Sequence, residues 1–441
     1  MRAMTKTATD TKTSPEALIA ERCQIFLQER GPRHALREIN EAAIARFETL
    51  KFPHSKHEVF IFVNTGELAG TSFALQKKSA ADPAFIKRHI YSGCENSALV
   101  ICDGIYRADL SDTSALAGSV EIKTLSEAVA DKSVKQYLLD TAQDENDAFA
   151  CLNTAFLDEG TVLEFPDKTV CEPVIQILYL STGSDAGPVT SYPRLLVKMG
   201  AMAEAKIIVK YVGQPGNYFV NSAQDFIIGE GAGVTYSQIQ ADPATAWNFT
   251  KTRVSLYRNS RFIATNAMSG CRLARNHFDA NLKQEGAELR VNGVSVLKDK
   301  EQAHNFIHIR HLAPHCVSNQ HFKNIVNDES RSSFDGAVTV GVGAQMTQSD
   351  QLINNLMLSG SAHVDTKPNL MIYADDVKCT HGATVGQIDD EQLFYLKTRG
   401  LTHEQAEALL TTSFAKAIVQ TVAFPAVIED LNNTLLKKLE A

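Results

Sequence analysis

Apolar positions follow two different periods along this chain. Near both ends they recur every three or four residues, which is the period of an amphipathic helix. This pattern covers residues 15–30 and 35–50, returns at 391–400, and continues from Thr402 to about Leu439 with a break at Pro425. From about 147 to 373, short apolar runs alternate instead with turns rich in Gly, Asn, Asp and Ser. The pattern predicts a long β region between helical segments.

The β region contains many short strands and no long helical pattern. Such a region fits a barrel, a sandwich or a parallel β-solenoid. Many of its runs are apolar on both faces, which suits buried parallel strands and favours the solenoid. Stacked strand repeats commonly have roughly 20 residues per coil. The predicted strands are residues 173–180, 194–198, 206–212, 225–228, 235–239, 288–291, 293–297, 306–309, 337–342 and 352–358.

Four segments follow from these patterns. They are a disordered, Thr-rich tail at 1–14, a mixed and largely helical N-terminal domain at 15–146, a β core at 147–378 and a helical C-terminal domain at 379–441. In the last segment, Gly400 is a typical helix C-cap, and Thr402 with Gln405 forms a capping-box pattern. The apolar residues expected on one face of the next helix are Ala406, Leu409, Leu410 and Phe414.

Composition and charge narrow the class of protein. The 441 residues carry a net charge of -8, with 44% apolar and 21% charged residues, as in an ordinary soluble globular protein. The acidic balance disfavours a general nucleic-acid binder, and no apolar run reaches the roughly 18 residues that span a membrane. The eight cysteines include no CxxC pair, which favours free thiols in a reducing compartment.

Two further patterns have simple structural interpretations. The chain has no GxxxxGK[ST] sequence, so a P-loop nucleotide site is excluded. The run Gly229–Gly233 precedes a predicted strand, where a dinucleotide loop needs a helix, and we interpret it as a turn.

The histidine-rich stretch 304–316 suggests metal ligands, but His304 and His308 lie about 13 Å apart on a strand. We interpret these histidines as polar residues on a sheet surface.

The segment Ala374–Gln387 carries the densest chemistry, with two aspartates (Asp375 and Asp376), Lys378, Cys379 and His381. On an extended backbone Cys379 and His381 point to the same side, with alpha carbons about 6.6 Å apart. A thiolate and an imidazole both bind iron, but stable sites need three or four ligands. The pair is therefore half of a site that another subunit completes, or Cys379 is a buried structural cysteine. The two aspartates either add oxygen ligands or cap the turn.

This segment resembles the signature of the SufD family of iron–sulfur cluster assembly proteins. The related SufB family has a glutamate–histidine–glutamate sequence where this chain has Lys378-Cys379-Thr380-His381-Gly382, which favours SufD. Further matching pieces are Ser318-Asn319-Gln320-His321-Phe322-Lys323, Phe334-Asp335-Gly336, Asn355-Leu356-Met357-Leu358, Thr366-Lys367-Pro368 and Leu393-Phe394-Tyr395-Leu396.

The resemblance implies a right-handed parallel β-helix between helical N- and C-terminal regions. It implies pairing with SufB through the end of the β-helix, with Cys379 and His381 at that contact, and a SufC ATPase held by the C-terminal helices. Lys378 would then lower the pKa of the Cys379 thiol. The residues that match the ATPase-docking region are Leu393, Phe394, Tyr395, Leu396, Arg399, Gly400 and Phe414.

We therefore expect a non-catalytic scaffold without a tightly bound cofactor, in which SufC hydrolyses ATP. Iron or a nascent iron–sulfur cluster is held transiently at the partner interface, and the resemblance leaves open a flavin in the complex and a homodimer of this chain. The expected compartment is the bacterial cytoplasm or a plastid-type organelle. Two alternatives stay open: an assembly platform without metal chemistry, and a β-helix carbohydrate-active enzyme, whose acidic pair the β region does not show.

Overall fold

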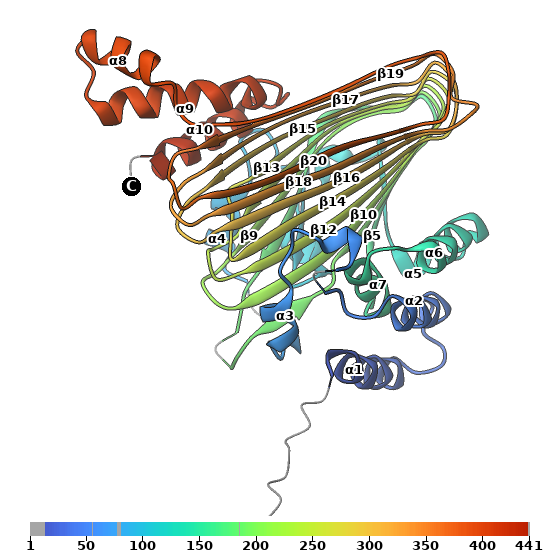
Figure 1. The fold of residues 1–441 in the computed structure, drawn as a ribbon. Helices are drawn as coiled ribbons and strands as arrows, with labels where there is room; N and C mark the ends of the chain where they lie inside the picture. The colour runs from blue at the N-terminus through green and yellow to red at the C-terminus, as the bar shows by residue number, and fades with distance from the viewer. Residues whose placement is uncertain (1–13, 55, 77–80, 185, 440–441) are drawn as a thin grey trace, which may run out of the picture.

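The protein is a two-sheet parallel β-solenoid with helices packed outside both sheets (Figure 1). The computed structural model describes residues 14–54, 56–76, 81–184 and 186–439. From β8 onwards the chain alternates between the sheets, so that even-numbered strands form sheet A and odd-numbered strands form sheet B. The predicted solenoid is confirmed, and the barrel and the sandwich are excluded.

The strands of successive coils pair in parallel, and only β2–β3 and β4–β5 are antiparallel among the named strand pairs. Sheet A consists of β4 (Glu121–Thr124), β5 (Thr161–Phe165), β8 (Arg194–Met199), β10 (Tyr218–Ile228), β12 (Trp247–Leu256), β14 (Leu273–Leu282), β16 (Gln302–His311), β18 (Arg331–Val340) and β20 (His363–Ile372), with β7 (Val189–Ser191) beside β10 and β1 (Ala74–Leu75) beside β7. Sheet B consists of β2 (Ala98–Cys102), β3 (Ile105–Tyr106), β6 (Val170–Ser181), β9 (Glu204–Gly213), β11 (Gly233–Ala241), β13 (Arg261–Met268), β15 (Glu288–Leu297), β17 (Val317–Val326), β19 (Thr347–Met357) and β21 (Val377–Gly386).

Each coil is longer than the roughly 20 residues expected from stacked repeats. Trp247 pairs with Leu273, a separation of 26 positions, and Arg331 pairs with His363, a separation of 32. One coil supplies a strand to each sheet and two connecting turns, so strands of about ten residues require this length. For the same reason, the two short strands predicted between 288 and 297 form the single strand β15.

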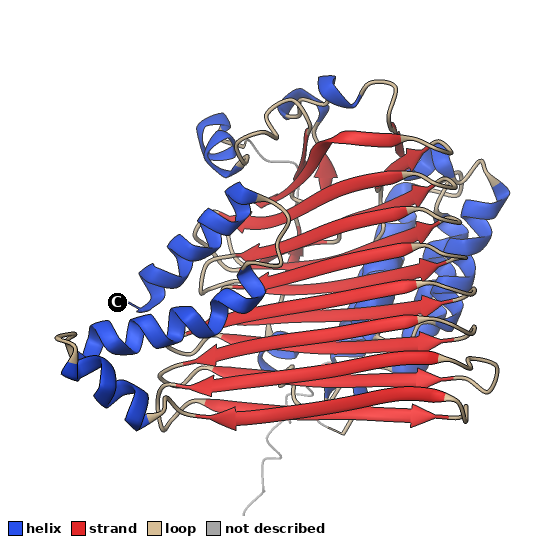
Figure 2. Cartoon of the chain, turned by 90° about the horizontal axis from the view of Figure 1, so that it is seen from above, coloured by secondary structure: helices blue, strands red, loops and turns tan. Residues whose placement is uncertain are grey.

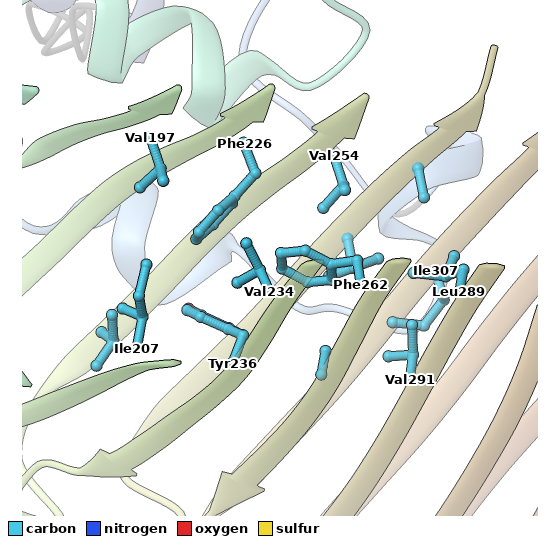
Figure 3. Packing of buried hydrophobic residues seen from close by; sticks show 14 of the residues in the cluster. Val197, Ile207, Phe226, Val234, Tyr236, Val254, Phe262, Leu289, Val291 and Ile307 are labelled. Carbon is cyan, nitrogen blue, oxygen red and sulfur yellow. The ribbon is translucent and has the colours of Figure 1, made fainter. Parts of the chain in front are cut away.

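Alternate side chains fill the space between the two sheets (Figure 3). Tyr236 of β11 meets Phe226 of β10 with ring centroids 5.1 Å apart, and Phe226 meets Phe262 of β13 at 5.0 Å. Each fully buried ring of this kind contributes on the order of 1.5–3 kcal/mol to folding. This interior cluster continues from coil to coil, so that each new coil is stabilised by the one before it.

The outer faces of both sheets are also covered, which explains why many strands are apolar on both faces. On sheet A, Phe149 from the N-terminal segment packs edge-on against Phe219, with ring centroids 5.8 Å apart. On sheet B, Ile418 from the C-terminal helices shares a buried cluster with Ile239. The apolar residues on both faces of these strands therefore reflect contact with the covering helices on one face and with the solenoid interior on the other.

The N-terminal segment begins at Ser14, whose side chain accepts a hydrogen bond from the Ala17 N–H and caps the first helix. Ser14 is thus part of the helical region and not of the predicted tail, whose other residues, 1–13, lie outside the described part of the chain. The helices of this segment are α1 (Pro15–Arg30), α2 (Arg37–Leu50), α3 (Gly66–Gly70), α4 (Pro83–His89), α5 (Leu125–Ala128), α6 (Lys132–Asp144) and α7 (Ala148–Ala155), with 3-10 turns at Glu58–Phe60, Ala108–Leu110 and Ser114–Leu116.

A buried ion network joins this segment to sheet A. Asp147, the N-cap of α7, lies 2.5 Å from Arg275 and 2.6 Å from the His277 ring. Glu145 pairs with Arg253, and all these side chains are nearly or fully buried. Substituting one partner of such a buried ion pair strongly destabilises the fold, because the other partner is left as an uncompensated buried charge. The N-terminal segment and the solenoid are therefore one packed unit.

The predicted boundaries of the β core differ from the structure at both ends. α7 lies after the expected start at 147, whereas β2 and β4, from the expected N-terminal domain, belong to the two sheets. At the other end, β21 continues to Gly386. Cys379 and His381 therefore lie on the last strand of the solenoid and not in the C-terminal helical domain.

The C-terminal helices are α8 (Asp390–Thr398), α9 (His403–Val419) and α10 (Pro425–Leu439), and α9 and α10 lie across the outer face of sheet B (Figure 2). The capping box of Thr402 and Gln405 is confirmed at the start of α9. The face of α9 predicted from the sequence is only partly buried, because Ala406 is fully buried whereas Leu409 is 47% exposed. Contact with sheet B sets the buried stripe of α9, and that stripe continues to Ala415 and Ile418.

Candidate functional site

No described segment caps the last coil of the solenoid. β20 and β21 are the terminal strands of sheets A and B, and within the described ranges each pairs with one strand only. Alternate positions that are buried in β18 and β19 are half-buried or exposed in β20 and β21. This open end, formed by β20 and β21, presents unpaired backbone groups and apolar side chains. It is a surface to which another chain can add strands.

Cys379 and His381 lie two residues apart on β21 at this open end. They pair in register with Ser349 and Gln351 of β19, which are buried inside the solenoid. Cys379 packs against the interior cluster, and residues two apart on a strand share a face. The pair therefore has the same-side arrangement expected from the sequence. It lies at the mouth of the solenoid, which is the opening between β20 and β21 at the open end.

The environment of Cys379 favours the protonated thiol. Burial raises the pKa of the Cys379 thiol, and a hydrogen bond with the Ser349 backbone offsets only part of this effect. Lys378 is exposed and points away from the mouth, because neighbouring residues of a strand alternate between its faces. The expectation that Lys378 lowers this pKa is therefore wrong. In this chain alone, a metal ion must displace the thiol proton in order to bind.

Asp375 and Asp376 are exposed in the turn between β20 and β21. The Met346 N–H donates to the Asp376 carbonyl at 2.6 Å, and the Asp376 N–H donates to Gln345 Oε1 at 2.9 Å. These bonds attach the turn to the coil below. Nowhere in the described residues do three or more His, Cys, Asp or Glu side chains gather in a group that could hold a metal ion. Cys379 and His381 are thus two candidate ligands without a third beside them.

The histidine-rich stretch does not form a site. His304 Nδ1 lies 2.7 Å from Ser333 Oγ, and His308 Nε2 lies 3.1 Å from Thr339 Oγ1, both on the outer face of sheet A. The interpretation as surface polar residues holds for His308, which is half-buried, and is wrong for His304, which is 4% exposed although it lies on the outer face. It is also wrong for His311, which is fully buried inside the solenoid. The glycine run is confirmed as the turn before β11.

A second exposed feature is α8, which projects beyond the strands (Figure 1) and has no buried residue. Phe394 is 69% exposed and Tyr395 is 55% exposed, and the Arg399 guanidinium lies over the Tyr395 ring. Phe414 differs from them, because the Lys323 ammonium lies 4.4 Å from its ring centroid and attaches α9 to β17. The remaining predicted docking residues, Leu393, Leu396 and Gly400, lie on α8 or at its end.

Comparison with known proteins identifies the family. The sequence profile of the SUF system FeS cluster assembly SufBD core domain matches residues 179–414, and that of the SufBD protein N-terminal region matches residues 21–177. The chain belongs to the SufBD family. The resemblance to SufD is confirmed, and this SufBD protein is an iron–sulfur cluster assembly protein.

Relatives of this SufBD protein occur in bacteria and in a plant. It is 30% identical over 387 residues to an iron-sulfur cluster assembly SufBD family protein of Synechocystis sp., covering 85% of this chain and 84% of the relative. It is 30% identical over 234 residues to the iron-sulfur cluster assembly protein SufD of Escherichia coli, covering 53% and 55%. It is also 30% identical over 289 residues to the chloroplastic protein ABCI7 of Arabidopsis thaliana, covering 63% and 60%. No helix in the described ranges is long and apolar enough to cross a membrane.

Two interior residues beneath the site were not identified from the sequence. Ser349 and Gln351 precede Cys379 and His381 by 30 positions, which is one coil. Another coil earlier, 31 positions before them, Ser318 and Gln320 occupy the same register. These polar pairs recur at the coil spacing, a signal that becomes readable only when the coil length is known.

Proposed function

We propose that this SufBD protein is a non-catalytic scaffold subunit, and that an iron–sulfur cluster forms where it meets a SufB-type partner. The observation that carries the proposal is the position of Cys379 and His381 at the open end of the solenoid. Two ligands hold iron weakly, so the site becomes complete only when another chain covers this end. The free edges of β20 and β21 offer that chain backbone hydrogen bonds. Iron and sulfide are then the cargo of the scaffold.

The energy source in this proposal is a SufC-type ATPase bound by the C-terminal helices. The chain has no P-loop of its own. α8 exposes two aromatic side chains, Phe394 and Tyr395, and exposed aromatic residues often anchor protein contacts. Only residues 387–389 separate β21 from α8. Movement of docked ATPases is therefore transmitted to the strand that carries Cys379 and His381. Opening of the contact admits iron and sulfide, and closure shields the nascent cluster.

The chemistry assigned to the two ligands follows from their surroundings. The Cys379 thiolate binds iron once iron or the partner has displaced its proton. Neutral His381 supplies a nitrogen lone pair, which iron also accepts. The exposed side of the pair faces the covering partner, so that this partner supplies the missing ligands.

Co-expression with SufB-type and SufC-type subunits tests the proposal. The wild-type chain, a Cys379→Ala/His381→Ala variant and a Lys378→Ala control are co-purified, and iron and sulfide are measured per complex. We expect all three to form the complex and only the double variant to lose the cluster. Lys378 is the matched control because it lies on the outward face of the same strand.

The alternative is an assembly platform without metal chemistry. The raised pKa of Cys379 and its packing against the interior cluster favour this alternative, since they are also typical of a structural cysteine. Normal cluster content in an intact complex of the double variant would establish the platform. Failure of the wild-type chain to bind either subunit would contradict both functions.

A further inference from the structure

An amide ladder inside the solenoid ends directly beneath His381. Gln320 of β17, Gln351 of β19 and His381 of β21 occupy the same register position in three successive coils. Gln351 Nε2 donates a hydrogen bond to Gln320 Oε1 at 3.1 Å. Gln320 is 1% exposed and Gln351 is 0% exposed, so both amides are inside the solenoid.

The oxygen of the Gln351 amide lacks a partner. Within the described residues, Gln351 Oε1 is a buried acceptor that receives no hydrogen bond. Leaving such a group unpaired is unfavourable, and buried polar groups in folded proteins are nearly always paired. Because Nε2 is bound to Gln320, in the coil before, Oε1 is left for a donor in the coil after. The residue paired with Gln351 in that coil is His381.

The opposite sheet limits how far the Gln351 amide can move. A Cβ atom at Gly336 of β18 would lie 2.3 Å from Gln351 Nε2. The amide thus crosses the interior and reaches the backbone of sheet A, where only a glycine leaves enough space. Gln320 and Gly336 hold its nitrogen between them, which keeps the amide from rotating freely.

We propose that Gln351 is a positioning residue that fixes the ring orientation and tautomer of His381. Paired side chains of adjacent parallel strands are about 4.8 Å apart, so the imidazole reaches Oε1 by rotating its side chain alone. One ring N–H donates to Gln351 Oε1, and the lone pair of the other nitrogen points out of the mouth beside Cys379. Histidines that bind metals commonly donate their second N–H to an oxygen in this way.

An amide oxygen suits this position better than a carboxylate. It accepts the N–H without adding a negative charge, so it does not favour the protonated imidazolium, which cannot bind a metal. The inference rests on the proposed function, since it assigns Gln351 to the same two-ligand site. It adds that the ligand geometry is set from inside this chain before any partner binds.

The first test reads the His381 tautomer in the full-length chain without metal. The chain is labelled with 15N-histidine, and the His381 signals are identified by their loss in His381→Gln. We expect one tautomer in the wild type and a mixture in Gln351→Met, which removes the acceptor. Asn355→Leu is the matched control, because it also removes a buried amide from β19 but lies beneath Val385. Gln351→Glu keeps an oxygen at the same place and should retain the wild-type tautomer.

The second test measures cluster assembly in the co-expressed complex. We expect Gln351→Met to slow assembly roughly 10- to 100-fold, while Asn355→Leu remains close to the wild type. Gln351→Glu should also slow assembly, because its carboxylate favours the protonated imidazolium, which cannot bind a metal. A wild-type tautomer in Gln351→Met would overturn the inference, and so would a mixture already present in the wild type. If Gln351→Met does not fold, loss of the wild-type tautomer in Gln351→Glu would overturn it. Normal assembly in His381→Gln would instead refute the proposed function, and the tautomer would still decide whether Gln351 holds the ring.

Discussion

At the scale of single residues, the site depends on the surroundings of one thiol. Seven of the eight cysteines are buried, and only Cys379 is half-buried. Burial raises the pKa of the inaccessible thiols as well, that of Cys23 to about 12. Cys379 is therefore the thiol that reagents reach first, although its own pKa is also raised.

Alkylation of the folded chain tests this description of Cys379. We expect one fast-reacting thiol, absent in Cys379→Ser, and a rate that still increases above pH 8.5, the ordinary pKa of a cysteine. A raised pKa leaves less thiolate at pH 7, so Cys379 should react more slowly there than a free thiol such as glutathione. Mass spectrometry of the labelled chain at a series of pH values gives both results. A faster reaction than glutathione at pH 7 would contradict the assignment.

At the scale of elements, β21 and α8 are exposed for different reasons. β21 has a bare edge because, among the described strands, it pairs with β19 alone, and its inward positions are left uncovered. α8 lies beyond the strands, so sheet B cannot cover its aromatic residues. Both elements carry proposed contacts, and substitutions at their exposed positions should change binding without changing the fold.

The α8 surface is tested by Phe394→Ala/Tyr395→Ala. Aromatic anchors at protein interfaces are often worth about 2 kcal/mol or more, so we expect at least a 30-fold loss of affinity for the SufC-type subunit. The melting temperature of the isolated chain should stay the same, because neither ring is buried. Val342→Ala is the matched control, since Val342 is 74% exposed but lies at the opposite end of the strands. Equal affinity of the two variants, measured by calorimetry, would reject α8 as the docking site.

The open end is tested by Ala383→Asp on β21. Ala383 is exposed and shares the inward face with His381, so a carboxylate there stays hydrated in the isolated chain. In a complex it is buried without a partner, which costs roughly 2–5 kcal/mol and should abolish pairing with a SufB-type subunit. Gln348→Asp, on the outward face of β19, should pair normally. Co-purification that is unaffected by Ala383→Asp would place the contact elsewhere.

At the scale of the whole molecule, the fold buries groups that would bind protons in an unfolded chain. Burial lowers the pKa of His304 to about 3 and the pKa values of His308 and His311 to about 4. Unfolded histidines have a pKa of about 6.5, so below this pH the unfolded chain binds more protons than the folded chain. The stability linked to these histidines is complete above pH 6.5 and is lost as the pH falls towards 4.

Urea unfolding at a series of pH values measures this loss. We expect a constant stability contribution from these histidines at pH 7–8 and a decrease of about 2 kcal/mol per buried histidine at pH 5. His308→Gln should weaken the pH dependence by one such step. His403→Gln should not, because His403 is exposed on α9. An identical pH dependence in the two variants would contradict the linkage.

The sequence by itself determined the period of each segment and the chemistry of the signature. Helical spacing marked both ends of the chain, and the two-faced apolar runs favoured parallel strands, because these patterns arise from local geometry and from burial. The thiol and imidazole of Cys379 and His381 were also identified, since their same-side placement follows from a period of two. None of these conclusions requires knowledge of residues far away in the chain.

Only the tertiary structure decided which residues meet across coils. The register of one coil on the next brings Gln351 beneath His381, although 30 positions separate them. It also turns His311 inward and Lys378 outward, and the uncapped last coil exposes the mouth. These contacts and exposures depend on the coil length and on which coil is the last. Both are set by the packing of the whole solenoid and cannot be predicted from the local pattern of residues.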